Sequence, residues 1–174
     1  DIYQCDKHHL VGANDIMKSR EKLSKNGKFH AMLATKNIPE AIAYYQLFKQ
    51  YHPSLNVVAV FDNNIDNSDG GIVREDAIKE MLTDYNARYG MNYKLANYAQ
   101  YKKDVAKRLA HKKPYIGIEN DHTKQIDLLI VVTQMLTGYD SKWINTLYVD
   151  KVMKYVDIIQ AFSRTNRLFG PDQP

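Results

Sequence analysis

The stretch of this chain that most restricts its fold is an unbroken apolar run, Leu128-Leu129-Ile130-Val131-Val132. Alternating apolar and polar residues mark a strand with one face in water, whereas an uninterrupted run is typical of a parallel strand covered on both faces. Parallel strands need long crossover connections, which are usually helices. The run therefore predicts an α/β fold with a mostly parallel sheet that helices cover.

Shorter apolar runs predict further strands of the same sheet, at 29–34, 55–61 and 146–149. The intervening segments carry helix signals. Asn14 is a candidate N-cap for a helix that runs to about Ser24 and stops near Asn26-Gly27, and Asn37 or Thr35 could cap a second helix that ends near Tyr51. Strands and helices thus alternate along the chain, as expected of crossover connections.

Residues 72–113 predict two helices, at 74–89 and 95–111, and we expect this pair to be a helical insertion on the sheet domain. The cations of its second half alternate with tyrosines: Lys102, Lys103, Lys107, Arg108, Lys112 and Lys113 with Tyr98, Tyr101 and Tyr115. One interpretation is that the cations contact DNA phosphates, which requires only charge and reach. The other is a solvated helix face, with the tyrosines packed in the core.

Length and composition limit the class of protein. A chain of 174 residues suits one domain, 1–174, and no apolar run approaches the length needed to span a bilayer. The first residues do not form a signal peptide, and the single cysteine excludes an internal disulfide framework, so we expect a cytoplasmic protein. The histidines show no metal-ligand spacing, and no metal site is expected. The net charge of +4 mildly favours a polyanionic partner.

Polar residues follow the two C-terminal strands. Gly138 and Asp140 form a Gly-x-Asp loop after the apolar run, and Gln160, Arg164 and Arg167 follow the last strand. If this last segment is helical, the spacings of four and three residues place the three side chains on one face. Two arginines aimed together suit a polyphosphate, because each guanidinium presents paired N–H donors. A solvated basic helix end is the alternative.

This order of strand, Gly-x-Asp loop, strand and paired arginines resembles the last two motifs of superfamily 2 helicases and translocases. The residues within these motifs are similar to those of the restriction (motor) subunit of type I restriction enzymes. Tyr139 stands where that family usually has Phe, and Ser163 stands where helicases often have Gly. The resemblance is carried by residues 135–140, 145–151 and 159–167, and more weakly by 29–35 and 101–109.

The resemblance implies a RecA-like fold and the role of the second motor domain of an ATP-dependent double-stranded DNA translocase. It implies that Arg167 is an arginine finger, that Arg164 lies near the γ-phosphate, and that three residues line the nucleotide cleft: Gln160, Gly138 and Asp140. Thr35 and Thr133, at strand ends, become candidates for DNA phosphate contacts.

The resemblance also implies missing parts. The chain has no G-x-x-x-x-G-K-[ST] phosphate loop and no acidic box for Mg²⁺. In the family both lie on the first motor domain, and the nuclease lies further toward the N-terminus. ATP and Mg²⁺ would then be held jointly with that other motor domain, and the chain alone would be inactive. Implied partners are double-stranded DNA and the modification and specificity subunits, in a bacterial or archaeal cytoplasm.

Two alternatives to this reading stay open. One is the corresponding lobe of another superfamily 2 DNA helicase. The other is a binding module that kept the fold and lost nucleotide chemistry. The sequence of residues 145–167 favours the restriction enzyme over another helicase. The joint presence of Gln160, Arg164 and Arg167 argues against a binding module without nucleotide chemistry.

Overall fold

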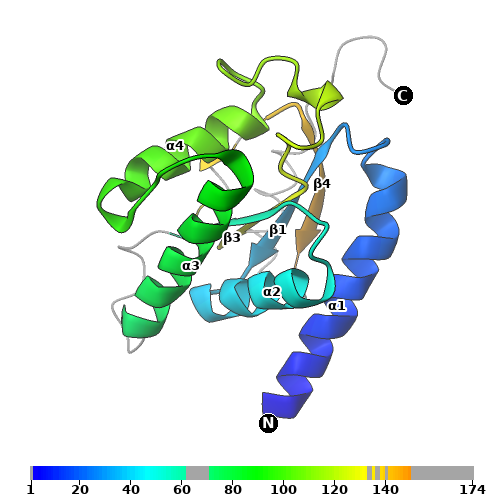
Figure 1. Ribbon diagram of the computed structural model, residues 1–174. Helices are drawn as coiled ribbons and strands as arrows, with labels where there is room; N and C mark the ends of the chain where they lie inside the picture. The colour runs from blue at the N-terminus through cyan, green and yellow to red at the C-terminus, as the bar shows by residue number, and fades with distance from the viewer. Residues whose placement is uncertain (1, 62–70, 133–134, 136–137, 140, 150–174) are drawn as a thin grey trace.

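A four-stranded parallel sheet forms the centre of the molecule (Figure 1). The computed structural model describes residues 2–61, 71–132, 135, 138–139 and 141–149. Within them the strand order is β2-β3-β1-β4, and all three neighbouring pairs are parallel. The predicted α/β class and parallel sheet are confirmed. The bounds are β1 His30–Thr35, β2 Val57–Val60, β3 Leu128–Val132 and β4 Ile144–Val149.

The two central strands, β3 and β1, are buried along their whole length. Every residue of β1 and β3 is buried, and Leu33 of β1 lies in register between Ile130 and Tyr148. This burial on both faces is the physical reason for the uninterrupted apolar run in β3. In β4, by contrast, only Ile144 is buried, and the remaining residues are half-exposed.

Helix α2, Ile38–Tyr51, forms as its sequence predicts. Asn37 is the N-cap, and its side chain accepts a hydrogen bond of 2.9 Å from the backbone N–H of Glu40. Pro39 occupies the first turn, where its missing N–H costs nothing. The helix packs onto the sheet, and its buried residues include Tyr44 and Phe48.

Helix α1, Ile2–Leu23, is longer than predicted, because Asn14 lies inside the helix and is not its N-cap. The helix lies beside α2 (Figure 1), and a side chain on Gly12 would come 2.9 Å from the Tyr44 hydroxyl. The predicted end of the helix is confirmed, because Lys25, Asn26 and Gly27 directly after it all have positive φ. A Cβ on Gly27 would overlap the His122 ring.

The crossover from β2 to β3 contains the predicted helical pair, α3 (Gly71–Tyr89) and α4 (Tyr98–Leu109), with short 3₁₀ turns η1 (Leu95–Asn97) and η2 (Ile118–Asn120). Both helices lie on one side of the sheet (Figure 1). They bury side chains in the core that the strands share, so the pair is an integral part of the fold. The tyrosines of α4 also cover the outer edge of β2: the Tyr98 hydroxyl bonds the N–H and C=O of Phe61, and Tyr101 donates to the Ala59 carbonyl. No helix within the described residues is long and apolar enough to cross a membrane.

Candidate functional site

The carboxyl ends of the strands form the edge at which ligands bind in open parallel sheets. Thr35 ends β1 and lies in register with Val132, the last residue of β3. Gly138 lies in the segment that follows β3; it is exposed, and among the described residues no atom beyond its chain neighbours lies within 4 Å of the position a Cβ would take. These residues therefore leave its backbone open to close approach by a ligand. Several predicted site residues lie outside the described part of the chain and stay predictions: Thr133, Asp140, Gln160, Arg164 and Arg167.

Thr35 does not support the predicted DNA contact. Thr35 is fully buried, and its hydroxyl lies 3.2 Å from the Asn37 carbonyl oxygen and 3.3 Å from the Val131 carbonyl oxygen. A DNA phosphate cannot reach a hydroxyl that is buried and faces these two carbonyl groups. The structure assigns Thr35 instead to joining the ends of β1 and β3 to the start of α2.

The N-terminus of α2 lies at the same edge, and its own side chains cap it. Glu40 accepts a hydrogen bond from the Lys36 N–H at 3.1 Å, while the Glu40 N–H donates to Asn37. This reciprocal pairing satisfies backbone donors that would otherwise be available to an anion. The described residues of this helix end therefore do not form a phosphate-binding site.

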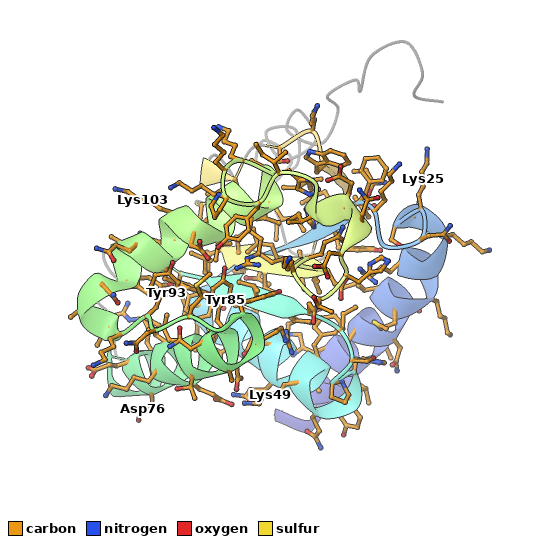
Figure 2. The ribbon with its side chains drawn as sticks, turned by 45° about the horizontal axis from the view of Figure 1, so that its top comes forward. Lys25, Lys49, Asp76, Tyr85, Tyr93 and Lys103 are labelled. Atoms are coloured by element: carbon orange, nitrogen blue, oxygen red, sulfur yellow. The ribbon has the colours of Figure 1, made fainter. Side chains whose placement is uncertain are left out.

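The exposed side of α4 carries the predicted basic residues. Lys103 and Lys107 are exposed and stand four residues apart, so they share one face. Lys102 is half-buried, with its ammonium 5.7 Å from the centre of the Tyr98 ring. Figure 2 shows Lys103 pointing away from the body of the molecule. Among the described residues, no carboxylate forms an ion pair with Lys103 or Lys107, so the charge of both is available to a polyanion.

Arg108, the fourth predicted DNA contact on α4, is only 2% exposed, and this prediction is corrected. Its Nε donates to the Tyr85 hydroxyl at 3.0 Å, its Nη1 to the Lys124 carbonyl at 2.8 Å and its Nη2 to the Tyr115 hydroxyl at 3.0 Å. Its guanidinium carbon also lies 3.9 Å from the centre of the Tyr89 ring and 4.1 Å from that of Tyr115. The guanidinium donors are thus used inside the protein.

Asp104 completes this buried group, which we call the arginine cage: Asp104, Arg108, Tyr85, Tyr89 and Tyr115. The Asp104 carboxylate accepts hydrogen bonds from the Tyr85 and Tyr115 hydroxyls and lies 3.6 Å from Arg108 Nη2. Burial raises the pKa of the Tyr85 and Tyr115 hydroxyls, and the hydrogen bonds to Asp104 add to this, so both stay protonated donors. The cage ties α3, α4 and the segment before β3 together.

A signal for this burial exists in the sequence. Tyr101, Val105 and Arg108 follow one another at spacings of four and three, which places Arg108 on the apolar stripe of α4. The lysines fall between those positions. A second feature that sequence reasoning missed is a pair of buried histidines, His30 and His111, whose side chains contact each other.

Comparison with known proteins identifies the chain's family. The family model of type I restriction enzyme subunit R domain 3 matches residues 27–174. The chain belongs to this family. It is 31% identical over 182 residues to the endonuclease subunit of the type I restriction enzyme SauCOLORF180P of Staphylococcus aureus (strain COL), and 33% identical over 183 residues to that of SsaAORF53P of Staphylococcus saprophyticus.

Both alignments cover 100% of this R-subunit domain but 19% of the relative. A shorter match, 40% identical over 50 residues, joins 29% of the chain to 5% of the HindI endonuclease subunit of Haemophilus influenzae. The chain therefore corresponds to about a fifth of the length of its Staphylococcus relatives, and it is homologous to a part of endonuclease subunits. The predicted resemblance to type I restriction enzymes is confirmed at this level.

Proposed function

We propose that this R-subunit domain is the second RecA-like motor domain of a type I restriction enzyme and takes part in ATP-driven translocation of double-stranded DNA. The observation that carries the proposal is the family match over residues 27–174, which includes the paired arginines. The parallel sheet supports it, because the segments with Gly138 and with Arg164 and Arg167 follow the carboxyl ends of β3 and β4, the two strands that flank β1, at the same edge of the sheet. ATP would bind between this edge and another motor domain.

The residues at this edge fit a nucleotide in part. Gly138 is exposed, as close approach of a ligand requires, and Lys36, which directly follows β1, is an exposed cation that the described residues place at this edge. Further positive charge would come from Arg164 and Arg167, with Gln160 and Asp140 completing this wall of the cleft. The phosphate loop and the acidic Mg²⁺ residues would come from the other motor domain. Bound ATP supplies the free energy for movement along DNA.

Arg167 has the most specific proposed role. A guanidinium placed at the γ-phosphate stabilises the charge that develops on the transferred group, and such arginine fingers increase the rate by about a thousandfold or more. Arg164 would hold the same phosphate from the adjacent turn. Three lysines of α4, the exposed Lys103 and Lys107 and the half-buried Lys102, would contact the DNA backbone.

The test uses the complete restriction subunit that contains this domain, assembled with its modification and specificity subunits. Arg167→Ala should reduce DNA-stimulated ATP hydrolysis at least a hundredfold, with little change in melting temperature. Arg167→Lys should also fail, because an ammonium lacks the planar paired donors of a guanidinium. Arg88→Ala, at an exposed arginine on α3, is the matched control and should hydrolyse ATP normally.

Normal hydrolysis by a well-folded Arg167→Ala subunit would contradict the finger assignment. If the wild-type complex itself hydrolysed no ATP, the domain would be a binding module that kept the fold only, and the motor proposal would fail.

A further inference from the structure

A chain of four polar groups lies buried at the start of β1. His30 is fully buried, and its Nδ1 lies 2.5 Å from the carbonyl oxygen of Ile126. Its Nε2 lies 2.8 Å from Nε2 of His111, and Nδ1 of His111 lies 2.9 Å from Oε2 of Glu119. We call these groups, from Ile126 through His30 and His111 to Glu119, the histidine chain.

The histidine chain joins several elements of the fold. His30 begins β1, His111 follows α4, and Glu119 lies in η2. The ring of Trp143, just before β4, stacks on the His111 ring with centroids 4.1 Å apart and planes 12° apart. A change of charge on His111 would therefore act where α4, η2 and the start of β4 meet.

The histidine chain has fewer hydrogens than hydrogen-bonding contacts. Both of its ends are acceptors, because a carbonyl oxygen and an ionised carboxylate carry no hydrogen. Three contacts link the four groups, but two neutral imidazoles supply only one N–H each. With neutral rings and an ionised Glu119, one of the three contacts must bring two lone pairs together. A third proton would complete all three hydrogen bonds.

The surroundings keep that proton out at neutral pH. Burial lowers the pKa of His30 to about 3, despite the hydrogen bond to Ile126, and the charge of Arg20 on α1 acts in the same direction. Burial also lowers the pKa of His111; Glu119 opposes this shift, and Lys142 adds to it. Both rings are therefore neutral at pH 7, and the histidine chain lacks one hydrogen.

We propose that the histidine chain is a binding site for a single proton, which is empty at neutral pH and fills at His111 on acidification, with Glu119 as counter-ion. The filled state has an imidazolium that donates from Nε2 to His30 and from Nδ1 to Glu119. This proposal does not depend on the motor function, because it rests only on the described residues.

The direction of the pH effect follows from the lowered pKa values. Above pH 6.5 the histidines are neutral in the folded and the unfolded chain, and their contribution to stability is fully present. As the pH falls below 6.5, the unfolded chain binds protons before the folded chain does. Stability is therefore lost between pH 6.5 and the folded pKa of His111, and the contribution of His30 continues this loss down to about pH 3.

The substitution Glu119→Gln separates this proposal from an ordinary ion pair. The amide can donate an N–H to Nδ1 of a neutral His111, so it supplies the missing hydrogen without adding a titratable group. At pH 8 the melting temperature of the 174-residue chain should rise by about 2–4 °C, which is the shift typical of one repaired contact in a chain of this size. At pH 5 the order should reverse, because only the wild-type chain keeps the counter-ion for a charged His111.

The matched control is Glu80→Gln, which removes an exposed carboxylate paired with Lys49. Its melting temperature should stay within about a degree of wild type at both pH values, with no reversal. In the wild-type chain, imidazole ¹⁵N chemical shifts should show His111 neutral at pH 8, taking up one proton with a midpoint below 6.5.

Two results would overturn the proposal. If Glu119→Gln lowered the melting temperature at both pH values, His111 would already be charged and would form a permanent ion pair. If the variant matched the wild type throughout, or if His111 did not titrate between pH 8 and pH 4, no proton site would exist.

Discussion

The two sides of helix α4 carry cations of the same charge in opposite environments. On the buried side, Arg108 uses its guanidinium donors within the arginine cage and is enclosed by tyrosine rings. On the outer side, Lys103 and Lys107 extend into solvent without a carboxylate partner among the described residues. The contrast teaches that charge alone does not mark a DNA-binding residue. The position of a cation on the helix, and the partners that reach it, decide what it does.

The largest effect should come from the buried side. Arg108→Ala removes one member of a largely buried ion pair and leaves the Asp104 carboxylate without its counter-ion, with only the hydrogen bonds from Tyr85 and Tyr115, which costs about 3–5 kcal/mol of unfolding free energy. Arg108→Lys should recover only part of this, because an ammonium cannot donate in three fixed directions to Tyr85, Tyr115 and the Lys124 carbonyl. Urea denaturation measures the free energy of unfolding of both variants. A decrease of less than about 1 kcal/mol for Arg108→Ala would show that this arginine contributes no more to stability than an exposed lysine.

An intermediate effect is expected where α4 covers the edge of β2. Tyr98→Phe leaves the buried N–H and C=O of Phe61 without the hydroxyl that both contact, at a cost of about 1–3 kcal/mol. Tyr101→Phe removes only one donor, to the Ala59 carbonyl, and should cost less. Amide hydrogen exchange at Phe61 gives a local readout, since its protection should fall in Tyr98→Phe and stay unchanged in Tyr101→Phe.

The comparison also shows how far the sequence predicts this fold. Strands β2 and β3 were predictable because burial leaves an uninterrupted apolar run, and α2 was predictable because Asn37 and Pro39 are local signals. The start of α1 was not predictable from the sequence. Asn14 resembles an N-cap, but it lies inside a longer helix that packs against α2. Local signals fail where a tertiary contact decides the boundary.

The candidate site was less predictable for the same reason. Arg108 and Thr35 were assigned to DNA by residue type and position, but their environments depend on groups distant in sequence: Tyr85 and Lys124 for the arginine, Val131 for the threonine. The histidine chain links residues 81 positions apart and has no spacing signature. Predictions for Arg164 and Arg167 rest on the family pattern, which the described residues do not test.

The smallest effect on stability, and the sharpest functional contrast with Arg108, should come from the α4 lysines. Replacing Lys102, Lys103 and Lys107 together by Gln should change the unfolding free energy by less than about 0.5 kcal/mol per site, because none of the three has an ion-pair partner among the described residues and the side chains of Lys103 and Lys107 are exposed. Their proposed role is long-range attraction and phosphate contact, which releases counterions from DNA. Each lost contact should then reduce the slope of log K against log salt by about 0.9.

The measurement is a salt titration of DNA binding by the complete restriction subunit, for the wild type and the triple variant. Lys79→Gln on α3 is the control, because this exposed lysine is already paired with Glu75 and Asp76. A slope that falls by two to three units only in the triple variant would place DNA along the outer side of α4. An unchanged slope would make that side a solvated surface. The two sides of α4 would then differ only in stability, and the DNA contacts of this domain would have to lie elsewhere.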